Sequence, residues 1–233
     1  MTTISTCPPS FADGRVAASL AVVRQRIARA GGDSESVRVV AVTKGFGPEA
    51  VAAARGAGLT DVGENYAAEI LSKAPGPAGT CWHFLGAVQR NKVRSLAPLV
   101  DVWQAVTRLV EGARIAQCAP GARVLIQVDY TGLPGRNGCA PDAAPELARA
   151  LMDLDLHVQG LMTVAPPGVP EADAAFHSLR RLADALGLAE CSMGMSEDLE
   201  AAIAAGSTMV RIGRALFGDR PPGKVGALSR PGP

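Results

Sequence analysis

The sequence has few aromatic residues and no marked excess of either charge. Aromatic residues make up 4% of the 233 residues, whereas hydrophobic residues make up 48%. The core must therefore be built from Ala, Val and Leu and not from stacked rings. There are 23 basic and 22 acidic residues, a net charge of +1. This balance provides neither a basic footprint for a nucleic acid nor a patch for an anionic membrane surface.

Paired cysteines and long apolar runs are also missing. The five cysteines are scattered and odd in number, and none forms a C-x-x-C motif. This argues against a disulfide framework or a zinc site and indicates a reducing compartment. Cys81 and Cys191 fall within predicted strands, which indicates buried and unreactive thiols. No window approaches the length of a membrane span and the first residues lack a basic signal region, so we expect a cytoplasmic protein without a membrane segment.

Short apolar runs alternate with helical patterns along most of the chain. Each run is bounded by glycine, proline or polar residues, which is typical of buried parallel strands. The eight predicted strands are 37–43, 61–65, 81–86, 101–105, 124–129, 156–164, 191–195 and 209–213. A further helix precedes the first strand, beginning at Asp13 and ending at the pair Gly31-Gly32.

This rhythm predicts an α/β fold, a single (β/α)8 barrel of the TIM type with an additional N-terminal helix. No change of composition divides residues 1–233, so we expect one domain, with flexible tails at about 1–10 and 221–233. An open, doubly wound parallel sheet is the alternative fold. We expect the protein to be a monomer.

The first predicted strand ends in a lysine. Residues 39–45 read Val-Val-Ala-Val-Thr-Lys-Gly, so Lys44 has its stem in the barrel and its amine at the rim. Desolvation there lowers the pKa of an amine and makes it a usable nucleophile toward an aldehyde. Taken alone, a lysine that extends from a strand end to solvent explains the stretch equally well.

Polar residues recur where the other strands end, which in such a barrel is the end that carries the active site. They are Lys44, Asn65, His83, Asp129, the Met162-Thr163 pair, Ser196 and the Arg211–Arg214 run. Ser196 is predicted to cap a helix over 197–205, and the Gly213-Arg214 turn follows the eighth strand. Phosphate sites after strands seven and eight are frequent in this fold, so these two turns are a candidate phosphate site.

A reactive lysine opposite a phosphate site suits a phosphorylated aldehyde such as pyridoxal 5'-phosphate (PLP). Arg211 alternates with Val210 and Ile212, so it points inward and can reach the pyridine nitrogen. An arginine keeps its proton, so it would leave that nitrogen unprotonated and the ring a weak electron sink. The alternative for Arg211 is a structural ion pair with Glu64 or Asp129.

Several motifs together resemble the pyridoxal phosphate homeostasis protein family, whose fold is similar to the barrel domain of bacterial alanine racemases. The matching stretches are Ala-Val-Thr-Lys (41–44), Gly-Glu-Asn-Tyr (63–66), Trp-His-Phe-Leu-Gly with Gln89, Asn91 and Lys92 (82–92), Leu-Ile-Gln-Val (125–128), Gly-Leu-Met-Thr-Val (160–164), Ser-Met-Gly-Met-Ser-Glu-Asp (192–198), Gly-Ser-Thr-Met-Val-Arg-Ile-Gly (206–213) and Ala-Leu-Phe-Gly (215–218). They span about residues 13–220, and the last three in combination are the most specific.

The resemblance implies a PLP-binding protein that buffers the cofactor or delivers it to apo-enzymes and has no firm catalytic turnover. It implies that Lys44 bonds to the aldehyde and that Arg211 faces the pyridine nitrogen. Ser196 and the Gly213-Arg214 turn would hold the phosphate. Asn65 and His83 would line the mouth, with Met162 beside them. The family commonly has Thr or Ser where this chain has Arg214, which changes the expected phosphate contacts.

Two enzymatic alternatives remain open. A PLP-dependent racemase needs a second acid or base, usually a tyrosine, opposite the lysine. The chain has only Tyr66 and Tyr130 and no second domain to supply one. In a class I aldolase-like barrel, Lys44 would attack a sugar phosphate directly. That lysine commonly lies on a late strand and not on the first, so the aldolase ranks last.

Overall fold

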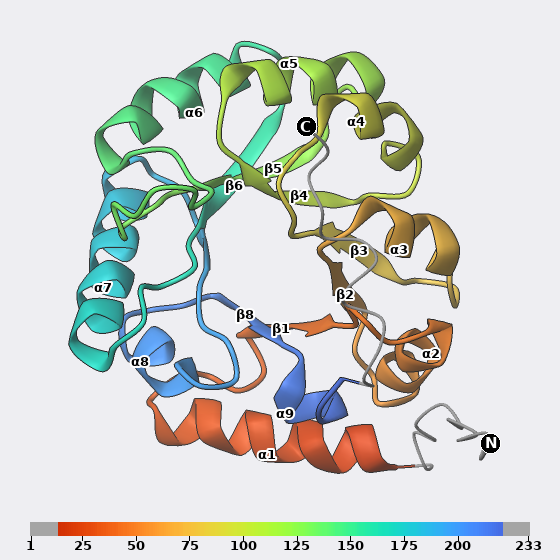
Figure 1. Cartoon of the computed structure of the whole chain (residues 1–233). Coiled ribbons are helices and arrows are strands. Elements are labelled where there is room, and N and C mark those ends of the chain that lie inside the picture. Colours follow the sequence, from red (N-terminus) through yellow and green to blue (C-terminus); the bar gives the residue numbers. More distant parts are fainter. Residues whose placement is uncertain (1–13, 221–233) are drawn as a thin grey trace, which may run out of the picture.

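The computed structural model describes residues 14–220, and within them the chain forms a closed barrel of eight parallel strands surrounded by helices (Figure 1). The strands follow one another around the barrel in sequence order, and β8 (Met209–Ile212) pairs with β1 (Arg38–Val42). The predicted (β/α)8 barrel is confirmed, and the open doubly wound sheet is wrong. The tails predicted at 1–10 and 221–233 lie outside the described residues.

The remaining strands are short, as is usual in such barrels. They are β2 (Asp61–Glu64), β3 (Cys81–Phe84), β4 (Val102–Val106), β5 (Arg123–Gln127), β6 (His157–Met162) and β7 (Glu190–Ser192). Several end earlier than the sequence predicts. The clearest case is β7, which stops at Ser192 because Gly194 has φ +94° and turns the chain away from the ladder.

Helices follow the strands and cover the outside of the barrel (Figure 1). They are α2 (Pro48–Gly56), α3 (Ala67–Lys73), α4 (Arg90–Leu96), α5 (Leu109–Cys118), α6 (Ala144–Met152), α7 (Val169–Ala185), α8 (Leu199–Ala204) and α9 (Arg214–Phe217), with the 3₁₀ turn η1 (Pro141–Ala143) before α6. No helix within residues 14–220 is long and apolar enough to cross a membrane.

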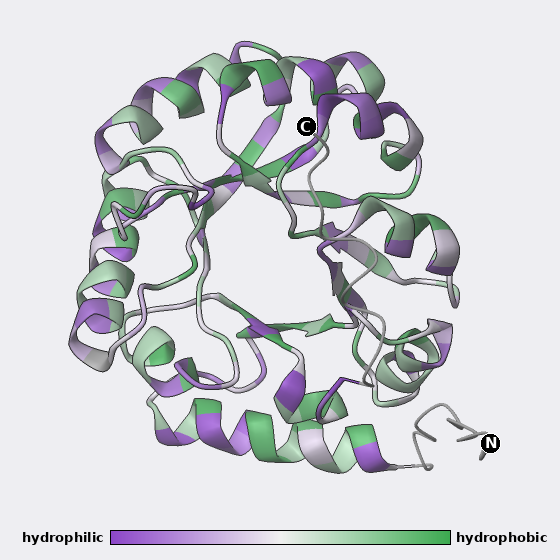
Figure 2. Ribbon diagram, viewed as in Figure 1, coloured by the Kyte–Doolittle hydropathy of each residue, from purple (hydrophilic) through white to green (hydrophobic). Residues whose placement is uncertain are grey.

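The predicted N-terminal helix is α1 (Arg15–Arg29), and it lies beside the barrel and not across its mouth (Figure 1). It contacts α8, α9 and α2. Val16, Val23 and Ile27 are buried on one face, which follows from their spacing of about two helical turns and then one. The other helices are also amphipathic, and in Figure 2 each carries hydrophilic and hydrophobic bands. α1 therefore closes the barrel wall where β8 meets β1.

Alternation along β8 divides its side chains between two environments. Val210 and Ile212 pack outward in the same apolar cluster as Val23 and Ile27 of α1. Arg211 points into the barrel, where it is buried and bonds to β7, as its place between two apolar residues predicts. The strand thus joins a hydrophobic outer layer to a polar interior.

The barrel interior carries an unusual row of polar side chains. The interior of a TIM barrel is ordinarily packed with branched aliphatic residues. Here His83, Gln104 and Ser192 are fully buried and Arg211 is 5% exposed. A buried polar group must find a hydrogen-bond partner to avoid a cost of about 1–3 kcal/mol. All four do so, and mostly with one another.

Candidate functional site

A cavity of about 670 Å³ opens at the C-terminal ends of the strands. Its volume is within the range of small-molecule sites. Of the eight residues predicted for the site, seven line it: Lys44, Asn65, Met162, Ser196, Arg211, Gly213 and Arg214. They come from the ends of β1, β2, β6, β7 and β8, so the closed barrel brings together residues as far apart in sequence as 44 and 214.

Lys44 lies two residues beyond the end of β1, at the rim of the barrel. Gly45 turns the backbone away from the direction of β1. Its φ is +80°, a conformation that a residue with a side chain rarely adopts. A Cβ at Gly45 would also lie 3.1 Å from the Cδ of Arg220. The glycine therefore allows the chain to turn tightly and bring Arg220 beside Lys44.

The amine of Lys44 makes no hydrogen bond or ion pair with residues 14–220, although the side chain is half-buried. Burial lowers its pKa, and the positive charges of Arg220 and Arg211 lower it further. Glu64 and Glu69 act in the opposite direction but do not reverse the shift. The result is a partly desolvated amine with a raised fraction of the neutral, nucleophilic form.

The backbone on both sides of Lys44 is held by a buried charge cluster, here named the Lys73 cluster, made of Thr43, Glu64, Glu69 and Lys73. Lys73 Nζ donates to Glu64 Oε1 at 2.6 Å, to Glu69 Oε2 at 2.7 Å and to the Thr43 carbonyl at 2.9 Å. Thr43 donates its hydroxyl proton to Glu64, and Glu69 accepts from the Gly45 N–H. Residues 43 and 45 are thus fixed, which holds Lys44 in place between them.

Burial raises the pKa of Glu64 to about 7, against the opposing effects of the Lys73 ammonium and the Thr43 hydroxyl. Its Oε2 atom has no hydrogen-bond partner among the described residues. The cluster therefore depends on Lys73, because without that ammonium Glu64 would be a buried carboxylate with one hydroxyl donor.

Arg211 enters the cavity from β8 with its guanidinium held by the ends of two neighbouring strands. Nη1 donates to the carbonyl of Ser192 at 2.7 Å and to its hydroxyl at 2.9 Å, and Nη2 donates to the carbonyl of Thr163 at 2.7 Å. No ion pair with Glu64 or Asp129 is formed within the described residues. Burial lowers the pKa of Arg211 to about 10, which still leaves it charged at neutral pH.

Ser196 does not cap a helix, contrary to the sequence prediction. α8 begins at Leu199 and its N-cap is Asp198, so Ser196 lies in the preceding loop. Its hydroxyl oxygen accepts from the N–H of Ala215 at 3.2 Å, in the first turn of α9. The hydroxyl and the start of α9 therefore face the same part of the cavity, even though the predicted cap is wrong.

Arg214 begins α9 and forms an ion pair with Glu197 at 2.8 Å. Both side chains are largely exposed, at 63% and 75%, so solvent screens the pair and it is worth at most about 1 kcal/mol. Gly213 is the N-cap of α9, and a Cβ there would lie 3.3 Å from the carbonyl oxygen of Val42. The turn after β8 thus packs closely on β1.

His83 is not one of the described residues that line the cavity, contrary to the sequence prediction. It points into the barrel from β3 and is fully buried. Its ring bonds to Asp61 at the start of β2 and to Gln104 of β4. The motif places it one residue before the strand ends at Phe84, and its side chain enters the barrel and reaches Asp61 at the start of β2.

The sequence did not predict the roles of three sets of residues at the cavity. Arg220 lines it, yet it lies just after α9 in a stretch without periodicity. Thr163 and Ser192 hold Arg211 partly through backbone carbonyls, which residue type does not reveal. Glu197, Asp198 and Asp219 place carboxylates in the lining. The cavity is therefore mixed in charge, with Lys44 and three arginines beside three carboxylates.

Comparison with known proteins shows the family to which the chain belongs. The alanine racemase N-terminal domain family matches residues 16–221. The pyridoxal phosphate homeostasis protein of Pseudomonas aeruginosa is 41% identical over 216 residues, covering 88% of this chain and 94% of the relative. The protein of the same name from Deinococcus radiodurans is 40% identical over 214 residues, covering 87% of this chain and 99% of the relative. The chain belongs to the pyridoxal phosphate homeostasis protein family.

A solved structure of PipY from Synechococcus elongatus PCC7942, a protein of 30% identity, carries bound PLP. It superposes with a TM-score of 0.76 and covers 87% of this chain and 100% of the PipY chain. The present chain therefore shares its barrel fold with a family member whose solved structure contains bound PLP.

Proposed function

We propose that this protein binds PLP at the C-terminal end of its barrel and buffers or delivers the cofactor in the cytoplasm, without firm catalytic turnover. The observation that carries the proposal is Lys44, a half-buried amine with a lowered pKa and no hydrogen-bond or ion-pair partner among the described residues, in the same cavity as Arg211. Family membership supports it, and so does the PLP bound to PipY. Apo-enzymes that need the cofactor are the partners we propose.

The residues present fit this group. Lys44 offers an amine that has no hydrogen bond or ion pair with the described residues, and the guanidinium of Arg211, held by two strands, would face the pyridine nitrogen. The Ser196 hydroxyl and the first turn of α9 provide hydrogen-bond donors on the phosphate side. Asn65 and Met162 line the cavity between these points. A phosphorylated aldehyde matches this set better than a neutral ligand, because Arg211, Arg214 and Arg220 all lie in the lining.

When bound, the cofactor supplies an aldehyde that bonds reversibly to a neutral amine. The chain contributes the amine and controls its proton. The neighbouring charges of Arg220 and Arg211 and the partial burial favour neutral Lys44, and the Lys73 cluster fixes the backbone on both sides of it. Arg211 donates hydrogen bonds and keeps its proton, so it would leave the ring nitrogen without one.

The cavity also supports a carrier over a racemase. Proton transfer on both faces of a substrate needs a second base opposite the lysine. Among the described lining residues there is no tyrosine, histidine or cysteine. Tyr66 is 37% exposed outside the lining, and burial raises the pKa of Tyr130 to about 12. Neither tyrosine belongs to the cavity lining, where a second base would have to lie.

A titration of the protein with PLP and with pyridoxal tests the binding. We expect saturable binding of PLP with a change in visible absorbance, weaker binding of pyridoxal, and loss of the absorbance change in Lys44→Ala. The circular dichroism spectrum of Lys44→Ala should match the wild type, since Lys44 packs at the rim. Absence of saturable PLP binding by the folded wild-type protein would refute the proposal.

Exchange of the Cα proton of L-alanine in deuterated water separates the carrier from the enzyme. We expect the PLP-loaded protein to exchange this proton far more slowly than about 1 per second, the lower end of ordinary turnover. Exchange at that rate or faster would favour the racemase instead.

A further inference from the structure

A chain of buried hydrogen bonds runs through the barrel interior from Arg211 toward the opposite end. Arg211 donates to the Ser192 hydroxyl at 2.9 Å, and that hydroxyl donates to Gln104 Oε1 at 2.7 Å. Gln104 Nε2 lies 2.6 Å from His83 Nδ1, and His83 Nε2 lies 2.9 Å from Asp61 Oδ1. The hydrogen-bond chain joins one side chain from each of five strands, in the order β8, β7, β4, β3 and β2.

The two ends of this chain fix the direction of every proton in it. An arginine can only donate, so the Ser192 oxygen accepts from Arg211 and gives its single proton to Gln104 Oε1. The Gln104 amide nitrogen must then donate to His83 Nδ1, which is therefore unprotonated. The ring proton lies on Nε2 and is donated to Asp61.

Asp61 is suited to end the chain because it is an anion at neutral pH. Burial acts to raise its pKa, but hydrogen bonds from His83 and Thr60 outweigh the burial and leave the pKa below its ordinary value. The guanidinium of Arg38 also lies 3.8 Å away. A cation at one end and an anion at the other polarise the intervening neutral groups in the same sense, which strengthens each bond.

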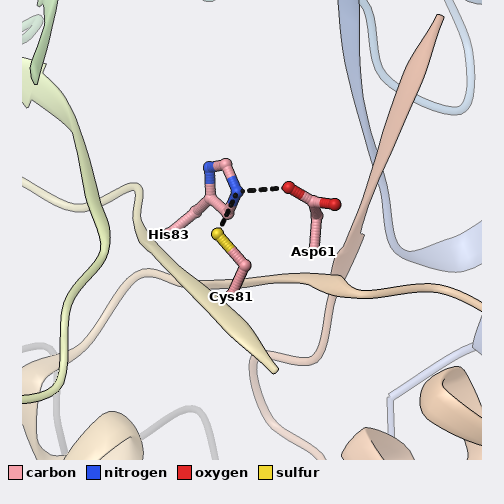
Figure 3. Close-up of side chains that lie close together, drawn as sticks. All are labelled: Asp61, Cys81 and His83. Carbon is pink, nitrogen blue, oxygen red and sulfur yellow. Dashed lines mark hydrogen bonds and ion pairs between the residues drawn. The ribbon is translucent and has the colours of Figure 1, made fainter. Parts of the chain in front are cut away.

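The far end of the chain has the composition of a metal site, and Figure 3 shows Asp61, Cys81 and His83 close together. Their donor atoms lie within 4.8 Å of one another. A histidine nitrogen must lack a proton to bind a metal, whereas the chain places the proton on Nε2. The guanidinium of Arg38 lies beside Asp61 and that of Arg123 beside Cys81. These positive charges also disfavour the binding of a metal cation. These contacts assign the cluster to the hydrogen-bond chain.

We propose that His83 and Gln104 are positioning residues for Arg211, and that the chain to Asp61 holds the guanidinium in the orientation in which it meets the cofactor's ring nitrogen. The inference rests on the proposed PLP site. It assigns a role to a row of polar side chains where such a barrel is ordinarily aliphatic. Neither residue touches the cavity, so each acts through Ser192 on Arg211.

Nitrogen-15 NMR of the imidazole rings in the protein without ligand tests the chain itself. The sequence has three histidines, so the signal of His83 is identified by its loss in His83→Gln. We expect an unprotonated Nδ1 and a protonated Nε2 at neutral pH. Ser192→Ala removes the hydroxyl that orients Gln104 and should introduce the Nδ1–H form. A wild-type Nδ1–H tautomer, or no change in Ser192→Ala, would overturn the chain.

Binding of PLP compared with its 1-deaza analogue, in which C–H replaces the ring nitrogen, tests the positioning role. His83→Leu should weaken PLP about three- to tenfold, the worth of one buried neutral hydrogen bond, and leave the analogue unchanged. His83→Gln should restore PLP binding, because its amide can both accept from Gln104 and donate to Asp61. Gln104→Met provides a second break in the chain if His83→Leu does not fold.

Three results would contradict the inference in distinguishable ways. Equal losses for PLP and the analogue would show that the chain acts on the fold and not on Arg211. A wild-type protein that binds neither ligand would refute the proposed function, and the positioning role with it. A shift of the His83 signal on adding Zn²⁺ that disappears in Cys81→Ser would replace the chain with a metal site.

Discussion

Two lysines, Lys44 after β1 and Lys73 at the end of α3, lie in contrasting surroundings. Lys73 is almost fully buried, and its ammonium donates to two carboxylates and a carbonyl. Lys44 is half-buried in the cavity and has no hydrogen bond or ion pair with the described residues. The same side chain therefore stabilises the barrel rim at one place and is left free to react at the other.

The difference lies in what compensates for burial. Removing an ammonium from water is costly, and three acceptors offset that cost for Lys73. At Lys44 the charges with the largest effect are the guanidiniums of Arg220 and Arg211, which add to the cost of burial and lower the pKa. Because the Lys73 cluster also bonds residues 43 and 45, the structural lysine positions the reactive one.

The largest expected effect comes from removing the structural lysine. Lys73→Met leaves Glu64 buried without its ammonium and should lower the free energy of unfolding by about 3–5 kcal/mol. Chemical denaturation measures it, and Lys44→Met is the matched control. That variant should keep or slightly raise stability, since it removes a half-buried amine that has no hydrogen bond or ion pair with the described residues. Equal losses of unfolding free energy in the two variants would contradict the proposed difference between Lys73 and Lys44.

The next effect concerns the phosphate side of the cavity. Ser196→Ala should weaken PLP binding by about 1.5–3 kcal/mol, the usual worth of a hydrogen bond to a charged group. Binding of pyridoxal, which lacks the phosphate, should be unchanged. If pyridoxal is weakened equally, Ser196 acts only by bonding to Ala215 and supporting α9.

A smaller effect appears in the pH dependence of the reaction with an aldehyde. Only the neutral amine reacts, so the rate rises with pH and levels off above the pKa of the amine. Burial lowers the pKa of Lys44 from 10.5, so the plateau should begin at a lower pH than for N-acetyl-lysine. Stopped-flow absorbance at several pH values measures both curves, and coincident curves would contradict the lowered pKa.

The smallest effect concerns the exposed ion pair at the mouth. Glu197→Gln frees Arg214 from its partner and should strengthen PLP binding by less than about 1 kcal/mol. The gain should disappear at high salt, because both groups are exposed. A gain that persists in 1 M salt would mean that Glu197 acts by some route other than screened charge.

The fold could be predicted because strand and helix patterns are local. The alternation of Val210, Arg211 and Ile212 is enough to place the arginine inside the barrel, and Gly45 marks the turn that follows β1. Contacts between distant elements could not be predicted in the same way. Ser196 pairs with Ala215, Arg220 comes beside Lys44, and His83 turns toward Asp61, and each depends on how the closed barrel aligns separate loops and strands.

The identity of the lysine that bonds to the cofactor is the most direct test of this account. The chain has four lysines, Lys44, Lys73, Lys92 and Lys224. After loading with PLP and reduction with borohydride, peptide mass mapping should find the pyridoxyl group on Lys44 and none in Lys44→Ala. A pyridoxyl group on Lys73, Lys92 or Lys224 with Lys44 unmodified would contradict the assignment of the unpaired lysine as the reactive one.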